Sequence, residues 1–459
     1  MSDLRESRLT ETLVTYGLST RFENLPAEVV DRAKRVIADE LGCMVLGSTI
    51  PPGQRMRSFV TSIGGIPEAT IIGGGAKAPM NYAALANGTS AHADELDGVH
   101  LSQGHPCTLM VASTVALCEG RGLSGKELIN ALVLSYDIGC RMVLGMGGGA
   151  AIKQKRHEHC TPLFAQGIAV AAGRLLGLEQ LAVQHAMSLA ALCIAVPHSY
   201  LDERNHMSKA MNMGQCAYAG VTGALLAGHG FEAHDGFVEA KGGLIDGWRT
   251  DKLDLNVFTA GLGEEFSILQ TGFKYYAAGY PIHSPLHGAL ELMREHAITT
   301  DRIARVRVGM APKSADVVDG RRMASISLQS MMSLGMVLGR LTYDDAHDEA
   351  ARNRADVQRL RNTIEIVRDE SISADSSRRA TWVEITTLSG QSHRGPERIA
   401  PGHWELGGMP WDDLRAKFDS LVGPRLGPEA SKTAFSFIER LEQHDSLTDL
   451  CEAVSGRTR

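Results

Sequence analysis

Apolar residues at helical spacing, many with small side chains, fill the first 260 or so residues and constrain the fold more than any other feature. Between Pro26 and Leu41 the apolar positions are Val29, Val30, Ala33, Val36 and Ile37. This spacing is the period of a helix with one buried face. The chain has 49 glycines and only 5% aromatic residues, so we expect its helices to meet through small side chains.

Further helices are predicted along the same part of the chain. Ser124 and Glu127 have the spacing of a capping box, which opens a helix that the glycines from Gly145 to Gly149 should end. Residues 163 to 177 and 179 to 196 are rich in alanine and predict two more helices. These segments together predict a helical body.

The pattern changes after about Tyr275. Polar and apolar residues alternate over 305–310, 363–367 and 381–388, which predicts half-buried, antiparallel strands. Helical spacing returns at Trp411, and we expect these last helices to pack on the first part of the chain. The sequence therefore predicts a mainly α protein with a small α+β module inserted near its C-terminal third.

Charge and composition argue against several classes of protein. The 46 basic residues are scattered and outnumbered by 53 acidic ones, so no nucleic-acid partner is expected. No signal peptide and no membrane-spanning apolar run is apparent, so we expect a cytoplasmic protein without a membrane partner. The cysteines form no C-x-x-C pair and are expected to be reduced core thiols, namely Cys43, Cys107, Cys118, Cys140, Cys160, Cys193, Cys216 and Cys451.

The densest polar cluster lies between His92 and His105. It holds three imidazoles and three carboxylates within fourteen positions, which would be costly to bury for stability alone and therefore suggests a site. Pro106 predicts a helix start with His105 at its cap, where the following amides would face an anion. The alternative is a solvated loop whose polar side chains cap neighbouring helices.

Three other segments carry candidate residues, each with a plainer alternative. His157 and His159 suggest a general base or a hydrogen-bond donor to a carboxylate rather than a metal site, or simply a capping loop. Lys209 stands at a predicted helix entry, where a lysine can hold a substrate carboxylate or be an ordinary surface residue. Lys274 and His283 flank a turn where the strands begin, and such a junction is a common place for a substrate cleft.

Several motifs occur in an order that resembles the MmgE/PrpD family. They are Asn87 to Asp94 with Gly104-His105-Pro106, His159 ahead of Arg174 to Leu178, Lys209 to Gly214, Phe273-Lys274 with His283, and Leu414 to Phe418. The resemblance covers nearly the whole chain. It implies a homodimer with a large helical domain, residues 1–269 and 404–459, and a smaller α+β lid domain with an antiparallel sheet, residues 270–403.

The resemblance also implies an active site between the two domains that uses no metal and no organic cofactor. The catalytic residues carried over from the family are Asp94, His105, His159, Lys209 and Lys274. The substrate-binding residues are predicted to be His92, His100, His283 and Ser330. Of the two histidines near residue 158, His159 is favoured over His157.

Two positions depart from the family pattern. Gly98 stands where the family often has threonine, and Ser330 stands where a tyrosine often follows a Ser-x-Gln motif. The loss of a hydroxyl and a phenol argues against decarboxylation of cis-aconitate and for a different substrate.

The chemistry follows from the substrates that the resemblance implies, which are small di- or tricarboxylates. Removing a proton beside a carboxylate builds negative charge, which Lys209 and Lys274 can stabilise. Either His105 or His159 is the base and the other donates to a leaving hydroxyl, with Asp94 orienting one of them. We expect a hydro-lyase similar to 2-methylcitrate dehydratase. The alternatives are an epimerase similar to iminodisuccinate epimerase, a carboxy-lyase similar to cis-aconitate decarboxylase, and a non-catalytic carboxylate-binding protein.

Overall fold

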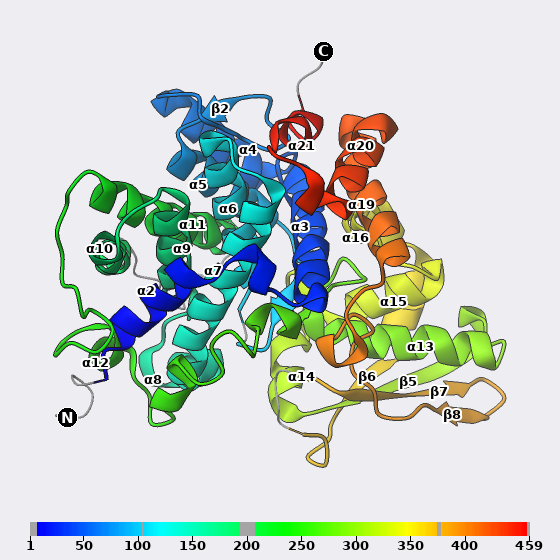
Figure 1. Ribbon diagram of the computed structural model, residues 1–459. Coiled ribbons are helices and arrows are strands. Elements are labelled where there is room, and N and C mark those ends of the chain that lie inside the picture. Colours follow the sequence, from blue (N-terminus) through cyan, green and yellow to red (C-terminus); the bar gives the residue numbers. More distant parts are fainter. Residues whose placement is uncertain (1–6, 103, 193–206, 374–377, 457–459) are drawn as a thin grey trace. The chain divides into compact units, whose positions relative to one another are not determined.

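The computed structural model describes residues 7–102, 104–192, 207–373 and 378–456. The chain forms two compact units (Figure 1), here called the helical unit, Met1–Thr271 with Trp411–Arg459, and the sheet unit, Gly272–Pro410. The domain boundaries predicted from the resemblance, and the lid role of residues 270–403, stay predictions.

The helical unit contains most of the helices. They are α2 (Leu9–Ser19), α3 (Ala27–Gly47), α4 (Pro51–Ile63), α5 (Met80–Ala91), α6 (Pro106–Arg121), α7 (Gly125–Gly145), α8 (Gly148–Arg156), α9 (Thr161–Leu175), α10 (Gln180–Ala191), α11 (Ser208–Gly228), α12 (Leu244–Trp248), α19 (Trp411–Leu426), α20 (Pro428–Glu439) and α21 (Thr448–Ala453). The short strands β1 (Ala69–Thr70), β2 (Lys77–Ala78) and β3 (Val99–His100) also belong to it, and β4 (Thr271–Gly272) lies at its boundary.

Small residues allow these helices to approach closely, as the composition predicts. A Cβ on Gly214 of α11 would lie 2.2 Å from the Leu85 carbonyl oxygen of α5. A Cβ on Gly167 of α9 would lie 2.1 Å from the Ser135 carbonyl oxygen of α7. Real side chains do not tolerate such distances, so glycine is required at both crossings. The first crossing sets α11, which carries Lys209 near its N-terminus, directly against α5.

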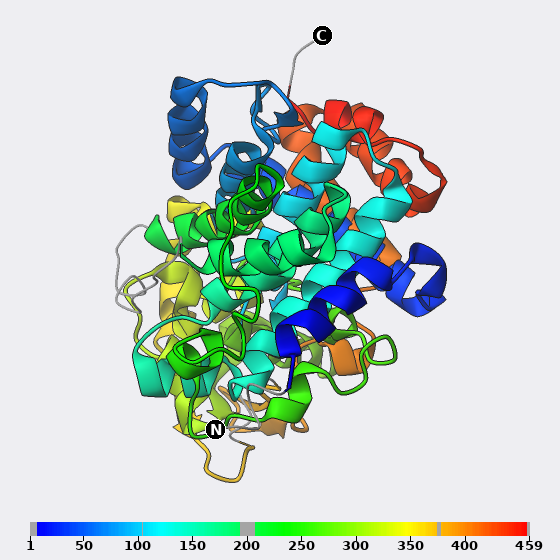
Figure 2. The ribbon, with the colours of Figure 1, turned by 60° about the vertical axis from the view of Figure 1, so that its left-hand side comes forward.

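The last helices pack on α3, as predicted (Figures 1 and 2). The sequence predicts a helix from Pro26 to Leu41, and α3 continues through Gly42 to Gly47. A Cβ on Gly42 would lie 3.3 Å from the ring of Phe418 in α19, so this glycine makes room for the C-terminal helix. The helix that Ser124 caps also forms, and it ends at Gly145.

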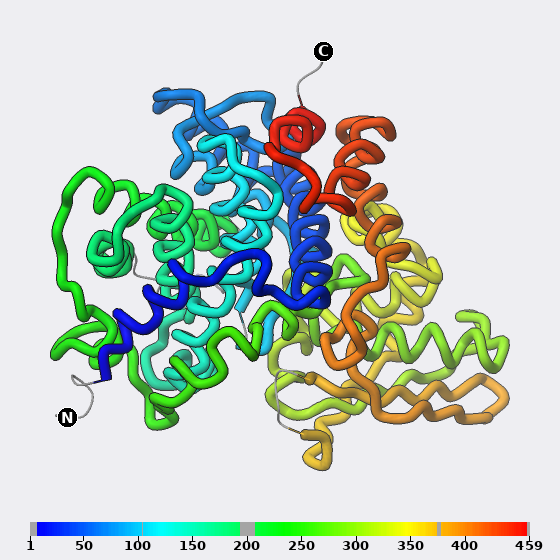
Figure 3. Tube along the Cα trace, viewed as in Figure 1, coloured from blue at the N-terminus to red at the C-terminus, as the bar shows by residue number. Residues whose placement is uncertain are grey.

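The sheet unit combines one sheet with short helices. Its helices are α13 (His283–Glu295), α14 (Pro312–Val318), α15 (Leu328–Leu338), α16 (Tyr343–His347), α17 (Glu349–Arg352) and α18 (Ala355–Arg361). Its strands are β5 (Ile303–Met310), β6 (Ile364–Arg368), β7 (Thr381–Thr387) and β8 (Ser392–Arg394), in the spatial order β6-β5-β7-β8. Helix α13 packs against β7, and the hairpin of β7 and β8 can be followed in Figure 3.

The predicted strands exist, but the prediction of a wholly antiparallel sheet is wrong. Strand β5 pairs antiparallel with β7, whereas β5 and β6 are parallel, with Val306 opposite Ile364. The reason is the helical segment from α14 to α18, which connects β5 to β6. A long helical crossover returns the chain in the same direction, while a tight turn reverses it.

Two composition-based expectations concern the helical unit. Helix α7 is long and apolar enough to cross a bilayer, but 94% of its most apolar window is buried inside the structure, as in the core helix of a soluble protein. The seven cysteines in the described part of the chain are buried and free, as expected. Cys193 and the predicted end of the helix at residue 196 lie outside the described residues.

Candidate active site

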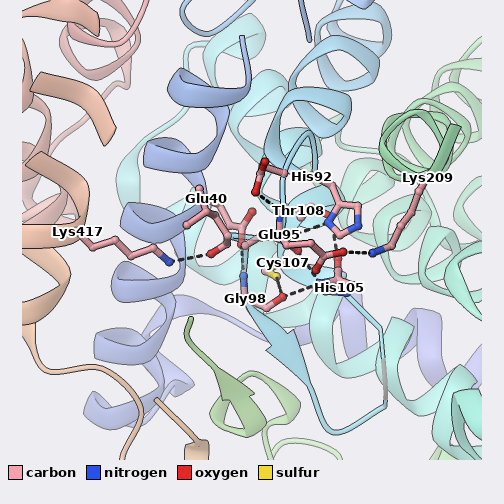
Figure 4. Close-up of polar contacts among 12 residues, drawn as sticks. Glu40, His92, Glu95, Gly98, His105, Cys107, Thr108, Lys209 and Lys417 are labelled. Carbon is pink, nitrogen blue, oxygen red and sulfur yellow. Dashed lines mark hydrogen bonds and ion pairs between the residues drawn. The ribbon is translucent and has the colours of Figure 1, made fainter. Parts of the chain in front are cut away.

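The predicted polar cluster occupies the loop between α5 and α6 in the helical unit. Helix α6 begins at Pro106 with His105 as its N-cap residue, as the sequence predicts. In Figure 4 the side chains of His92, Glu95 and His105 gather beside Lys209 of α11. The cluster is therefore not the solvated capping loop that was the alternative, because His92 and Asp97 are fully buried.

Asp97 connects two histidines of the cluster. Its Oδ1 lies 2.9 Å from Nδ1 of His92, and its Oδ2 lies 2.6 Å from Nδ1 of His105. The two imidazole ring centroids are 4.5 Å apart. Burial lowers the pKa of His92 to about 3, although Asp97 opposes this shift. His92 is therefore neutral near pH 7 and donates its Nδ1 hydrogen to the carboxylate.

The hydrogen bonds of His105 define where its proton lies. Nδ1 of His105 faces Oδ2 of Asp97 and also lies 2.9 Å from the carbonyl oxygen of Gly98. Both neighbours are acceptors, so Nδ1 carries the hydrogen. In the neutral ring the lone pair is then on Nε2, and Nε2 is the atom that can accept a proton.

The hydrogen bonds of His159 define the opposite arrangement. The backbone N–H of Thr161 donates to Nδ1 of His159 at 3.3 Å, and the Thr161 hydroxyl also contacts Nδ1. A backbone N–H can only donate, so Nδ1 of His159 holds the lone pair and Nε2 carries the hydrogen. The two histidines therefore have complementary tautomers.

The segments that carry these histidines lie against each other. A Cβ on Gly104, the residue before His105, would lie 2.6 Å from the Phe164 ring and 3.5 Å from Sγ of Cys160. Cys160 directly follows His159, and Phe164 is in the first turn of α9. Glycine at position 104 thus lets the two histidine segments meet.

The lysine of α11 is held by a carboxylate that the sequence analysis did not single out. Nζ of Lys209 lies 2.5 Å from Oε1 of Glu95, and both side chains are largely buried. The carboxylate of Asp94, the predicted catalytic residue, accepts a hydrogen bond of 2.7 Å from the backbone N–H of Glu95. Lys209 thus lies beside the cluster and forms an ion pair with Glu95, while the catalytic roles of Lys209 and Asp94 stay predictions.

Charged side chains from α3 and α19 contact the loop between α5 and α6. Glu40 of α3 accepts a 3.1 Å hydrogen bond from the backbone N–H of Gly98. Burial raises the pKa of Glu40 well above its usual value, and the nearby Asp97 and Asp39 raise it further. Lys417 of α19 lies 2.6 Å from Oδ1 of Asp39 and donates to the carbonyl oxygen of Leu96 at 2.8 Å. Two helices far apart in sequence thus position residues 96 to 98 (Figure 4).

His100, predicted to bind substrate, makes hydrogen bonds through both ring nitrogens. Nδ1 accepts from the backbone N–H of Ser102 at 3.0 Å, and Nε2 lies 2.8 Å from the carbonyl oxygen of Ser267. Burial lowers the pKa of His100 to about 4. His100 is therefore neutral near pH 7, and its hydrogen bonds connect the loop before α6 with Ser267. The predicted contact of His100 with substrate stays a prediction.

The remaining predicted residues belong to the sheet unit. Lys274 is fully buried, and Nε2 of His283 donates to the carbonyl oxygen of Ala278 at 3.1 Å. Ser330 lies in the first turn of α15. Their predicted roles in catalysis or substrate binding stay predictions.

His92, Asp97 and His105 also form the kind of group that can hold a metal ion, because their ligand atoms lie within 4.8 Å of one another. A metal would need a lone pair on each nitrogen that it binds. Nδ1 of His105 faces two acceptors and so carries a hydrogen instead. The geometry around Nδ1 of His105 therefore favours a hydrogen-bond network over metal binding through this atom.

Comparison with known proteins identifies the family. The MmgE/PrpD N-terminal domain profile matches residues 11–254, and the MmgE/PrpD C-terminal domain profile matches residues 276–443. The chain belongs to the MmgE/PrpD family. The predicted resemblance is confirmed.

Curated relatives of this MmgE/PrpD chain include cis-aconitate decarboxylases. The Aspergillus terreus enzyme is 26% identical over 304 residues, 63% of this chain and 61% of the relative. The Homo sapiens enzyme is 22% identical over 465 residues, 98% of this chain and 95% of the relative. A cis-aconitate decarboxylase-like protein of Aspergillus oryzae is 24% identical over 319 residues, 66% of this chain and 65% of the relative. The match thus spans about six tenths of the fungal relatives, and the similarities support a lyase-type enzyme of carboxylic acids.

Proposed function

We propose that this chain is a hydro-lyase that removes water from a hydroxylated di- or tricarboxylic acid. The observation that carries the proposal is the complementary pair of histidines, with a proton acceptor at Nε2 of His105 and a hydrogen-bond donor at Nε2 of His159. Elimination of water needs both functions, one toward a C–H bond and one toward oxygen.

The proposed reaction begins at His105. Its Nε2 takes a proton from the carbon next to a substrate carboxylate, and Asp97 stabilises the imidazolium that forms through its 2.6 Å contact with Nδ1. The electron pair of the broken C–H bond forms the carbon–carbon double bond, and the hydroxyl leaves from the neighbouring carbon. The proton held by His105 passes to this hydroxyl, so that water and an unsaturated acid are released and the histidine is neutral again.

His159 and Lys209 are proposed to stabilise negative charge during this step. A neutral imidazole that donates from Nε2 can polarise a carboxylate oxygen or the leaving hydroxyl without a proton transfer of its own. Lys209 supplies a positive charge near the same loop, where the carboxylate of Glu95 holds it in place. The proposed role of Lys274 as a second cation rests on the family resemblance alone.

A second candidate is decarboxylation, because the curated relatives are named cis-aconitate decarboxylases. The pair of histidines can also serve this reaction, since it needs a proton donor to carbon. The Gly98 and Ser330 departures argue against decarboxylation of cis-aconitate and for a different substrate. A homodimer, a cytoplasmic location and independence of metal ions are further parts of the proposal, supported by the family resemblance and the composition.

The test is the ultraviolet absorbance of a new unsaturated carboxylate, measured with a chelator present for citrate, 2-methylcitrate, malate and cis-aconitate. A rise with one hydroxy acid supports the hydro-lyase and names its substrate. Release of carbon dioxide from cis-aconitate without a rise would replace it with the decarboxylase. Uptake of deuterium from solvent into an otherwise unchanged acid would replace it with an epimerase.

A further inference from the structure

A small cavity in the sheet unit is lined by an unusual number of arginines. Its volume is about 150 Å³, and four of its lining residues are arginines, namely Arg321, Arg322, Arg352 and Arg361. The first two precede α15, and the other two end the helices α17 and α18. The remaining lining residues are uncharged and include Ser330 and Gln358.

The cavity has no carboxylate among its lining residues. Other arginines close by in the sequence form ion pairs with carboxylates. Arg340 pairs with Asp345 at 3.1 Å, and Arg354 pairs with Asp356 at 2.6 Å. The bonds found in the described part of the chain for the cavity arginines are to backbone oxygens, from Arg321 to Val317 at 2.8 Å and from Arg352 to Ala346 at 2.6 Å. A guanidinium has five N–H donors, so these bonds orient the groups and leave donors for a ligand.

Electrostatics makes an anion the natural ligand of this cavity. Two like charges a few ångströms apart repel by about 1 kcal/mol in water and several times more where water is partly excluded. Arg321 and Arg322 are exposed, which reduces this cost. A bound oxyanion would convert the repulsion into charge-assisted hydrogen bonds, which are the stronger kind.

The volume indicates the size of the ligand. A site for one water molecule needs only about 10–15 Å³ on the same measure, so a cavity of about 150 Å³ has room for an anion of several atoms. Guanidinium groups recognise carboxylates and phosphates through paired hydrogen bonds. We propose that this cavity binds a small multivalent oxyanion, a polycarboxylate or a phosphate, and that it does so without help from Lys209.

This proposal goes beyond the proposed reaction, because it concerns binding by the sheet unit. Ser330, predicted from the resemblance to contact substrate, lines the cavity. A polycarboxylate bound there would therefore belong to the same chemical class as the proposed substrate. Binding and turnover can be measured separately, so the two proposals fail independently.

The experiment is isothermal titration calorimetry on the full chain with citrate, inorganic phosphate and acetate at constant ionic strength. Citrate or phosphate should bind at least tenfold more tightly than acetate. Arg322→Gln and Arg361→Gln should each weaken this binding about tenfold, which corresponds to the loss of one charge-assisted hydrogen bond. The control is Arg305→Gln, which removes an exposed arginine on β5 that does not line the cavity.

Titrations of the Lys209→Ala variant distinguish anion binding in this cavity from binding in the candidate active site. The affinity for the preferred anion should be retained in Lys209→Ala, and the Arg322→Gln effect should persist there. Citrate and phosphate titrations distinguish the two kinds of ligand. The proposal is overturned if neither anion binds more tightly than acetate, if Arg305→Gln weakens binding as much as Arg322→Gln, or if Lys209→Ala abolishes binding.

Discussion

The loop cluster of the helical unit (His92, Glu95, Asp97, His105 and Lys209) pairs its charged groups with one another, whereas the arginine cavity of the sheet unit (Arg321, Arg322, Arg352 and Arg361) does not. In the loop cluster, Asp97 contacts two histidines and Glu95 contacts Lys209, and these groups are largely buried. In the cavity, four arginines share one space without a lining carboxylate, and several of them are exposed. The first arrangement fixes the positions of protons, whereas the second leaves positive charge to be neutralised from outside.

The two arrangements suit different chemical tasks. A buried, internally balanced network is costly to disturb and holds each proton on a defined atom, which suits acid–base chemistry. A partly solvated set of arginines without carboxylates can be substituted with little loss of stability, and a bound anion would stabilise it most.

His105→Gln should reduce turnover by about 10²–10⁴-fold, because glutamine has no atom that takes up a proton near neutral pH. His159→Gln is the matched variant. Its turnover should fall much less, because the glutamine amide keeps an N–H donor near the position of Nε2. The measurement is exchange of substrate hydrogen in deuterium oxide with the acid identified in the absorbance panel. Exchange that survives in His105→Gln and disappears in His159→Gln would reverse the two assignments.

Lys209→Ala should lower turnover by about 10²–10³-fold with the fold retained, because a positive charge near the developing anion is lost. This change also removes the ion pair between Lys209 and Glu95. The double variant Lys209→Ala/Glu95→Gln controls for the resulting buried charge, and circular dichroism checks folding. Unchanged turnover in both variants would mean that the proposed pocket is misplaced.

Asp97→Asn should lower the free energy of unfolding by about 3 kcal/mol, because two histidine N–H groups lose their charged acceptor in a buried site. Asp94→Asn is the matched control in the same loop. Asp94 is partly exposed, so we expect a change within about 0.5 kcal/mol. Chemical denaturation of both variants measures the difference, and equal effects would contradict the central position given to Asp97.

His100 should make stability depend on pH. Burial holds its pKa at about 4 in the folded chain, below the ordinary value of 6.5, so the unfolded chain binds the extra proton first. The stabilising contribution is therefore complete above pH 6.5 and is lost as the pH falls toward 4. His100→Gln should lose less stability over this range, by up to about 1.4 kcal/mol per pH unit. Parallel pH dependence in both proteins would show that His100 does not titrate as expected.

The cavity arginines should contribute least to stability. Arg322→Gln is expected to change the free energy of unfolding by no more than about 0.5 kcal/mol, because an exposed group in a like-charged set is removed. Thermal unfolding without and with citrate makes the comparison with Asp97→Asn direct. A large loss of stability in the absence of citrate would mean that Arg322 stabilises the fold rather than binds a ligand.

Periodicity was sufficient to predict several helices of the helical unit and the strands of the sheet in the sheet unit. Helix α3 and strand β7 follow directly from spacings of about 3.6 and 2 residues. The parallel pairing of β5 with β6 could not be predicted in the same way. The direction of a strand depends on the route of the intervening chain, which local alternation does not encode.

The candidate site was predicted in part. Pro106 gave His105 its place at the start of α6, because proline favours the first turn of a helix. Spacing alone could not show that Asp97, rather than Asp94, contacts the two histidines, because Glu40 and Lys417 from distant helices hold this loop. A usable signal was present in α3, where two adjacent acidic residues interrupt an otherwise apolar helix end.

The packing of α19 on α3 has a consequence for the order of folding. The buried carboxylate of Asp39 pairs with Lys417, which is synthesised 378 residues later (417 − 39). Until then α3 lacks both this counter-charge and the aromatic contact of Phe418 beside Gly42. Contacts of such long sequence separation slow folding and expose apolar surface in the meantime. The packing of α3 in the helical unit is therefore complete only after the residues of α19 have been synthesised.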